Sequence, residues 1–120
     1  MNEKHVILII APPGDLQIGL HALLTTHLDV DVLVIGKGSL ALKVIDIHKP
    51  AMVILDDDLL NDTVPMIIQG VKSSCPNTAT IVMVNDEVGR QKMLGKGADL
   101  ILLKGFPPVK FLSLIEDRLS

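Results

Sequence analysis

The stretch PAMVILDDD at residues 50–58 contains the strongest structural signal in the chain. A proline precedes an unbroken apolar run at residues 52–55, and three consecutive aspartates follow it. An apolar run this short, without alternating polar residues, is typical of a strand that is buried on both faces, as in a parallel sheet. The aspartates at its end, Asp56, Asp57 and Asp58, are the first candidate functional residues.

Four further apolar runs resemble this one in length and composition. Each is rich in β-branched residues or leucine and is bounded by Gly, Pro, Asn or Asp. Segments with helical spacing follow the runs, and the segment between Asp86 and Gly97 has the weakest apolar stripe. This alternation predicts one α/β domain over residues 1–120, with a parallel sheet covered by helices on both faces. The other four predicted strands are residues 6–10, 30–35, 80–84 and 100–103.

Local signals predict where the helices begin. Asp15 is expected to cap the first helix and Ser39 the second, because both side chains can accept a hydrogen bond from a free backbone N–H. Pro65 lies near the start of the third predicted helix, and residues 107–108 are prolines at the start of the last, where proline is tolerated. Gly70 is unfavourable inside the third helix, so the sequence determines the length of that helix less well than that of the others.

Composition and charge exclude several classes of function. The chain has 11 Lys and Arg against 14 Asp and Glu, no Trp or Tyr, and only two Phe. We therefore expect no direct binding of nucleic acid, which usually needs a basic excess or an aromatic stacking platform. A single cysteine excludes a disulfide framework and suits a reducing cytosol. The apolar run at residues 6–10 is too short for a signal peptide or a membrane span, so we predict a cytoplasmic protein.

Polar side chains at the ends of three predicted strands mark a candidate site. In an open α/β sheet, ligands bind outside the carboxyl ends of the strands. Asp56 ends the third strand, Asn85 follows the fourth and Lys104 follows the fifth. An aspartate close to a lysine suits a phosphoryl or metal site, since the aspartate can act as nucleophile or ligand and the lysine can neutralise phosphate.

The whole chain resembles the receiver domain of response regulators in two-component signalling. Residues 50–56 are similar to the family's third strand, which ends in the phosphoacceptor aspartate, here Asp56. The run GADLILLK at residues 97–104 is similar to the fifth strand and its lysine, here Lys104. The resemblance implies a flavodoxin-like fold with strand order 2-1-3-4-5. This run, which begins with Gly-Ala-Asp, ends in Leu-Leu-Lys and is followed by prolines at residues 107–108, is most like receivers with a helix-turn-helix output, which implies transcription regulation within a phosphorelay.

Five positions depart from the family pattern, among them Gly105, which stands where the family usually has a proline after the lysine. The two acidic residues that hold Mg²⁺ in the family correspond here to Ala11 and Pro12, which have no ligating side chain. The hydroxyl residue at the end of the fourth strand corresponds to Asn85, whose amide can still donate a hydrogen bond to a phosphate oxygen. The aromatic switch position corresponds to Ile101, which is β-branched and is expected to stay packed in one rotamer.

These departures change the expected metal chemistry. Magnesium needs oxygen ligands in octahedral geometry, so the absence of two carboxylates should weaken its binding by several kcal/mol. We expect no cofactor and no high-affinity metal, and only weak Mg²⁺ binding is possible. Asp58 and Asp15 are the candidate replacement ligands, because Asp57 would alternate away from Asp56 if the strand continued.

The sequence supports two main hypotheses of function. The first is a divergent receiver module that is not an enzyme and binds a histidine kinase, another signalling protein or a second copy, with control by phosphorylation reduced or lost. The expected surface is formed by the fourth helix, fifth strand and fifth helix, where residues 90–110 carry five basic residues and one acidic residue. The second is a working phosphoacceptor that a histidine kinase phosphorylates on Asp56, with Lys104 and Asn85 holding the phosphate. A small flavodoxin-like ligand-binding domain is a third option, against which the few aromatic residues count.

Overall fold

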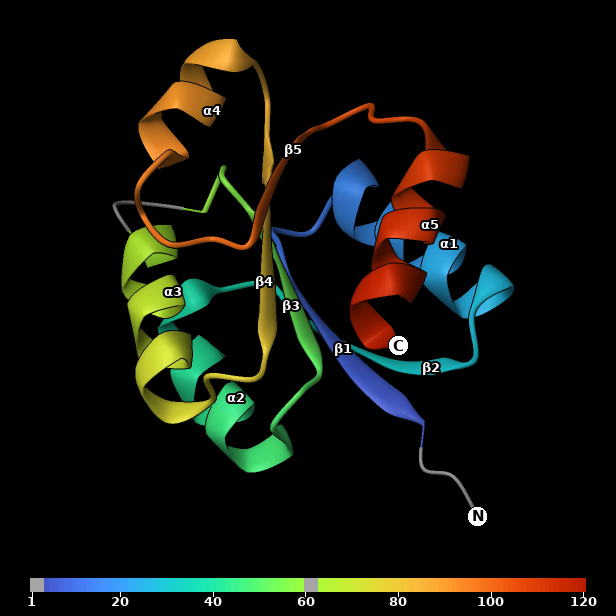
Figure 1. Cartoon of the computed structure of the whole chain (residues 1–120), viewed down its shortest axis with the longest axis horizontal. Coiled ribbons are helices and arrows are strands. Elements are labelled where there is room, and N and C mark those ends of the chain that lie inside the picture. The colour runs from blue at the N-terminus through green and yellow to red at the C-terminus, as the bar shows by residue number, and fades with distance from the viewer. Residues whose placement is uncertain (1–3, 60–62) are drawn as a thin grey trace.

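Five parallel strands form one sheet in the order β2-β1-β3-β4-β5 (Figure 1). The computed structural model describes residues 4–59 and 63–120. The predicted fold and strand order are confirmed, and each strand ends within one residue of its predicted bounds. The strands are β1 (His5–Ile10), β2 (Val30–Ile35), β3 (Met52–Asp56), β4 (Ala79–Val84) and β5 (Leu100–Leu103).

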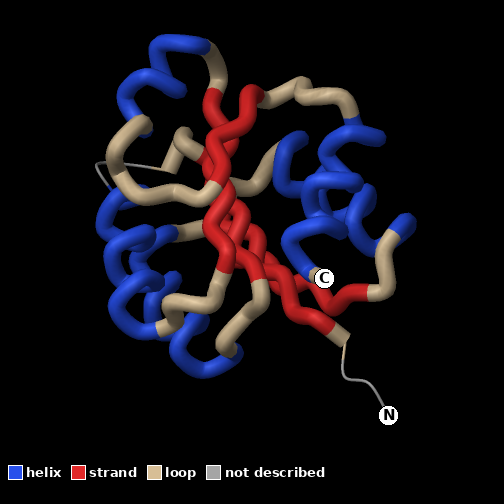
Figure 2. Tube along the Cα trace, viewed as in Figure 1, coloured by secondary structure: helices blue, strands red, loops and turns tan. Residues whose placement is uncertain are grey.

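Helices cover both faces of this sheet. In Figures 1 and 2, α1 and α5 lie on one face, while α2, α3 and α4 lie on the other. A short 3₁₀ turn at Gly38–Leu40 precedes α2. No helix in the described part of the chain has the length and apolar character needed to cross a membrane. The helices are α1 (Asp15–His27), α2 (Ala41–His48), α3 (Thr63–Ser74), α4 (Glu87–Met93) and α5 (Pro108–Leu119).

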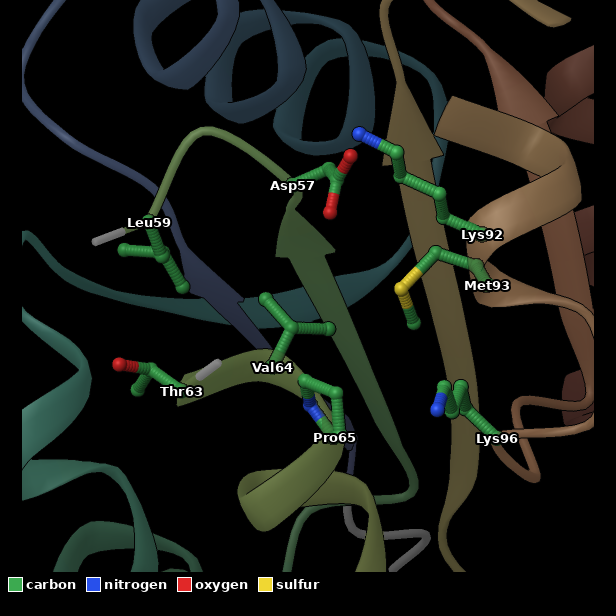
Figure 3. A pocket seen from close by; sticks show the side chains of 8 residues that line it. All are labelled: Asp57, Leu59, Thr63, Val64, Pro65, Lys92, Met93 and Lys96. Atoms are coloured by element: carbon green, nitrogen blue, oxygen red, sulfur yellow. The ribbon is translucent and has the colours of Figure 1, made fainter. Parts of the chain in front are cut away.

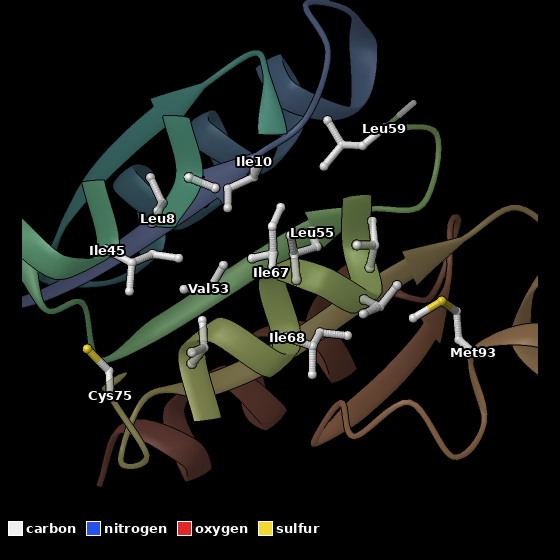
Figure 4. Close-up of a cluster of buried hydrophobic side chains, with 14 of the residues drawn as sticks. Leu8, Ile10, Ile45, Val53, Leu55, Leu59, Ile67, Ile68, Cys75 and Met93 are labelled. Carbon is white, nitrogen blue, oxygen red and sulfur yellow. The ribbon is translucent and has the colours of Figure 1, made fainter. Parts of the chain in front are cut away.

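The strands divide their side chains between two buried cores. Along β1, Leu8 and Ile10 pack toward α2 and α3, whereas Ile7 and Ile9 pack toward α1 and α5. All four side chains are fully buried. Burial on both faces explains the continuous apolar runs in the sequence. Figure 4 shows the first of these cores, which extends from Leu8 to Met93 of α4.

The two predicted helix caps are wrong, and the two proline predictions are correct. Gly14 is the N-cap of α1, and Asp15 is the first residue inside the helix. Ser39 lies in the 3₁₀ turn, and α2 begins only at Ala41 without a side-chain cap. A side chain caps a helix only from the residue that immediately precedes the first turn, so a shift of one or two residues removes the cap. Pro65 lies in the first turn of α3, and α5 begins at Pro108.

Gly70 does not shorten α3, because it lets α2 approach. The helix continues through Gly70 to Ser74. A Cβ atom at position 70 would collide with the side chain of Leu42 in α2. The glycine that is unfavourable for an isolated helix thus leaves room for the Leu42 side chain where α2 packs against α3.

Helix α4 is short and contributes little to the core. Only Met93 of its seven residues is buried, and Val88 is 61% exposed. Asp86 caps the helix by accepting a hydrogen bond from the Gly89 N–H at 2.9 Å. The thin apolar stripe in the sequence therefore corresponds to a short helix that contacts the core mainly through Met93.

Candidate functional site

The carboxyl end of β3 turns sharply at its first aspartate. Asp56 is only 6% exposed, and its side-chain Oδ1 accepts a hydrogen bond from the Asp58 N–H at 2.9 Å. Its backbone carbonyl accepts another from the Leu59 N–H at 3.1 Å. Aspartate commonly stabilises a turn by bonding the backbone two residues ahead. The turn returns Asp58 to the same side of the sheet edge as Asp56.

Lys104 bridges two of the aspartates. Its backbone N–H donates to the Val84 carbonyl at 2.8 Å, which fixes the residue beside the end of β4. Its Nζ lies 2.6 Å from Asp56 Oδ1 and 2.8 Å from Asp58 Oδ2. The structure thus brings together Asp56 and Lys104, the phosphoacceptor candidate and its predicted partner.

Asn85 contacts Asp58, not Asp56. Its Nδ2 donates to Asp58 Oδ1 at 2.7 Å. Both carboxylate oxygens of Asp58 therefore have a donor, the Lys104 ammonium on one side and the Asn85 amide on the other. We refer to Lys104, Asn85 and the Asp58 carboxylate that they hold as the Asp58 clamp.

The clamp and its neighbours shift one another's pKa values. Hydrogen bonds from Lys104 and then Asn85 lower the pKa of Asp58. Burial alone would lower the pKa of Lys104, but its bonds to Asp56 and Asp58 outweigh this effect and raise that pKa. The pKa of Asp57 is raised, first by partial burial and then by the negative charge of Asp58. Lys104 and Asp58 are therefore fully charged at neutral pH.

The end of β1 has no ligating side chain. Because Ile10 pairs with Leu55, Ala11 lies beside Asp56 at the sheet edge. Ala11 is buried, and its carbonyl accepts a hydrogen bond from Gln17 Nε2 at 2.8 Å. Pro12 is half-buried and lines a cavity of about 670 Å³ together with Asp58. Two apolar side chains therefore stand where the resemblance implies the acidic metal ligands.

The residues present do not fit the magnesium site that the resemblance implies. Within residues 4–59 and 63–120, no group of three His, Cys, Asp or Glu side chains could hold a metal ion. Both Asp56 and Asp58 already bind the ammonium of Lys104. Asp15 forms no hydrogen bond or ion pair with the described site residues and lines a hollow that includes Phe106 and Phe111. The structure thus places Asp58 at the site as a partner of Lys104 and does not bring Asp15 to it.

Asp57 is oriented toward α4, away from the clamp. It lines a cavity of about 710 Å³ between α3 and α4, and Figure 3 shows the Lys92 ammonium pointing toward its carboxylate. A Cβ atom on Gly89 would lie 3.3 Å from Asp57 Oδ2, so the carboxylate lies directly against α4. Asp57 therefore points to a different side of the strand end from Asp56 and Asp58, which both bind Lys104.

Ile101 packs where the aromatic switch residue was expected. Its side chain is partly buried against the core that contains Met93 of α4. No polar atom draws this side chain toward solvent, unlike a tyrosine with its hydroxyl group. That Ile101 keeps one rotamer remains a prediction.

The sequence reasoning missed the pairing of Asn85 with Asp58. It assigned Asn85 to a phosphate oxygen and Asp58 to a replacement metal site. The only hint of this pairing in the sequence is the run of three aspartates, because a tight turn after Asp56 brings Asp58 back beside Asp56. The periodicity of the strand does not specify that turn.

Comparisons with known proteins identify structures with a similar fold. No protein-family model matches the chain, and no curated protein matches it. Many solved structures do match. The signal receiver domain of an HD domain-containing protein from Pseudomonas fluorescens is 18% identical, with a TM-score of 0.85, over 98% of this chain and 95% of that chain.

Two further structures are informative. A response regulator receiver modulated diguanylate cyclase from Pelobacter carbinolicus is 30% identical, with a TM-score of 0.76, over 96% of this chain and 92% of that chain. A DNA-binding response regulator of the LuxR family from Staphylococcus aureus is 22% identical, with a TM-score of 0.79, over 95% of this chain and 98% of that chain.

Fold and site together define a doubly wound α/β domain with an aspartate and a lysine paired at the carboxyl edge of its sheet. Its structural relatives are signalling modules. The chain belongs to the response-regulator receiver domains of two-component systems.

Proposed function

We propose that this receiver domain acts by binding a partner protein and that phosphorylation of Asp56 contributes little to that binding. It acts in the cytoplasm as a binding module without enzymatic activity, metal or cofactor, and its partner is a histidine kinase or another signalling protein. The observation that carries the proposal is the ion pairing of Lys104. This lysine already binds Asp56 and Asp58, and the end of β1 provides no metal ligand.

The charge balance at the site supports this proposal. Phosphorylation of Asp56 would replace the single negative charge of its carboxylate with the nearly two charges of a phosphoryl group, beside Asp57 and Asp58. Among the described residues, Lys104 is the only cation in direct contact with Asp56. Without a metal site at Ala11 and Pro12, the added charge would be poorly neutralised.

The positions that would transmit phosphorylation also support it. Asn85 is already bound to Asp58, and Ile101 packs against the core near α4. A ligand shifts a conformational equilibrium only by its differential affinity for the two states. Because Asn85 and Ile101 already have these contacts, a phosphoryl group on Asp56 should bind the inactive and active conformations with similar affinity and shift their equilibrium little.

Helix α4 and the start of α5 provide a surface for the partner. Val88 and Val109 are 61% and 79% exposed, and Lys92 and Lys110 lie on the same two elements. Exposed apolar residues among basic ones suit a partner with an acidic, partly apolar face, or a second copy of this chain. Lys104, which the sequence grouped with these basic residues, belongs instead to the ion pairs of the site.

A working phosphoacceptor is the second candidate. The 2.6 Å contact between Asp56 and Lys104 favours it, because this pair is the part of the family's site that the chain retains. In this reading Lys104 would exchange Asp58 for the phosphoryl oxygens.

The deciding experiment compares wild type with Asp56→Asn, each with and without the small phosphodonor acetyl phosphate and Mg²⁺. Sedimentation measures self-association, and pull-down titration measures affinity for histidine kinases of the source organism. We expect the affinities of the two proteins to agree within about 1 kcal/mol, roughly fivefold, in all conditions. A donor-dependent gain of tenfold or more in wild type, abolished in Asp56→Asn, would establish the phosphoacceptor instead.

A further inference from the structure

We propose that Asp58 is a built-in substitute for a phosphoryl group, whose carboxylate fills an oxyanion site formed by Lys104 and Asn85. The inference rests on the proposed function and explains it, because a site that the chain itself fills has no need of phosphorylation. It predicts that removal of the Asp58 carboxylate opens a site for tetrahedral oxyanions such as phosphate.

The hydrogen bonds of Asp58 are those that an oxyanion would make. Oδ2 accepts from Lys104 Nζ at 2.8 Å, and Oδ1 accepts from Asn85 Nδ2 at 2.7 Å. The two donors come from the ends of different strands, β5 and β4, and meet on one carboxylate. Phosphate oxygens accept the same hydrogen bonds with similar lengths. Lys104 and Asn85 are therefore already arranged around an anion.

The backbone turn holds the substitute in place. The Asp58 N–H donates to Asp56 Oδ1, and the Leu59 N–H donates to the Asp56 carbonyl. Because Asp58 is tethered two residues from Asp56, it meets Lys104 at a high effective concentration. A free anion must therefore displace the Asp58 carboxylate, which loses little entropy when it binds Lys104 because the turn already holds it nearby.

The exposure of the side chains allows the site to open. The Asp58 side chain is 56% exposed, whereas Lys104 is 20% exposed and Asp56 is 7% exposed. The substitute therefore forms the outer layer, and the lysine and Asp56 lie beneath it. Truncation of Asp58 would uncover Lys104 and free the amide of Asn85, which is already exposed, without disturbing the buried core.

Charge favours this interpretation over a metal site. Both oxygens of Asp58 face hydrogen-bond donors, and a cation would have to displace the Lys104 ammonium from between two carboxylates. With Asp58 present, Lys104 faces two negative charges. In Asp58→Ala it faces only Asp56, and its remaining N–H donors are free for an anion.

The test is a titration of wild type, Asp58→Ala and Asp57→Ala with inorganic phosphate at constant ionic strength. NMR follows the Asn85 side-chain amide and the Lys104 ammonium. We expect Asp58→Ala to bind phosphate at least tenfold more tightly than wild type, with the largest shifts at these two groups. Asp57→Ala is the matched control, because it removes the same charge one residue away and leaves the clamp intact. It should bind like wild type.

Two further variants test whether Asn85 is needed for phosphate binding and whether the charge or the shape of the Asp58 side chain matters. Asp58→Ala combined with Asn85→Ala should lose the gained affinity, while Asp58→Asn, which keeps the shape of the side chain, should show a smaller gain. Equal binding by wild type and Asp58→Ala, or an equal gain in Asp57→Ala, would overturn the inference. These outcomes concern anion binding alone, so they leave the proposed function intact. That proposal fails separately, through donor-dependent association of wild type.

Discussion

The ends of β1 and β3 lie side by side at one edge of the sheet, yet their chemistry is opposite. At the end of β1 stand Ala11 and Pro12, with no charge. At the end of β3, Asp56 and Asp58 both bind Lys104. The family uses the first end to hold a cation and the second to accept an anion. In this chain the acidic residues remain at the end of β3, and the ammonium of Lys104 is the cation that contacts Asp56 and Asp58.

This difference concerns how the negative charges at the end of β3 are compensated. Three adjacent carboxylates repel one another, and the repulsion needs a positive charge nearby. Lys104 provides it for Asp56 and Asp58, while Asp57 turns away toward Lys92 of α4 (Figure 3). The aspartates are thus separated into a clamped pair and a single carboxylate against a helix.

The largest expected effect comes from removal of the central lysine. We expect Lys104→Met to lower the free energy of unfolding by about 2 kcal/mol, because buried Asp56 loses its charged partner and faces Asp58 without compensation. Urea denaturation at pH 7 measures the change. Lys110→Met, which removes an exposed lysine from α5, should change stability by less than about 0.5 kcal/mol.

A second variant tests the cause of that loss. Lys104→Met combined with Asp56→Asn should recover much of the stability, because no buried charge is then left unpaired. A loss of less than about 0.5 kcal/mol in Lys104→Met would show that solvent, and not the lysine, compensates the charges at the end of β3.

The next effect comes from restoring acids at the end of β1. We expect Ala11→Asp combined with Pro12→Asp to raise the affinity for Mg²⁺ at least tenfold, or about 1.4 kcal/mol, since two carboxylates then join Asp56. Isothermal titration calorimetry measures the affinity. The double asparagine variant, similar in size but uncharged, is the control. An unchanged affinity would show that the bridge from Lys104 to Asp58 excludes the metal, and not the apolar end of β1.

The fold was predictable because the same physical constraint repeats in every strand. Burial on both faces requires apolar residues at consecutive positions, so the runs mark the strands to within one residue. The helix starts were less predictable, as Asp15 and Ser39 show, because several neighbouring residues can serve as caps. Gly70 was misleading because its role is to leave room for the side chain of Leu42 in α2, and the sequence around Gly70 gives no sign of that contact.

The candidate site was predictable only in part. The positions of Asp56 and Lys104 at strand ends follow from topology, and their contact follows from the strand order. The partner of Asn85 depends on a turn and on side-chain rotamers at Asp57 and Asp58. Hydrophobic periodicity carries no information about either, so the Asp58 clamp could be seen only in three dimensions.

The smallest effect concerns Asp57 and Asp58, whose pKa values shift in opposite directions. The pKa of Asp58 is lowered, so its contribution to stability is complete above the unfolded-state pKa, near 4, and disappears as the pH falls through the lower folded-state pKa. The pKa of Asp57 is raised, so its favourable contribution is complete below the unfolded-state value and disappears as the pH rises through the folded-state pKa. Both groups are partly exposed, and each effect should be below about 1 kcal/mol because solvent screens the charges.

Urea unfolding between pH 3 and pH 7 at constant ionic strength separates the two. Asp58→Asn should lose less stability than wild type on acidification, because it lacks the group whose ionised form the clamp stabilises. Asp57→Asn should lose more on acidification, and at pH 7 it should equal or slightly exceed wild type in stability, since no carboxylate is then held partly buried beside Asp58. Identical acid limbs in all three proteins would mean that Lys104 and Asn85 do not distinguish Asp58 from its neighbour. The Asp58 clamp would then be a surface contact that does not contribute to stability. The difference between the ends of β1 and β3 would then depend on the ion pair of Asp56 with Lys104 alone.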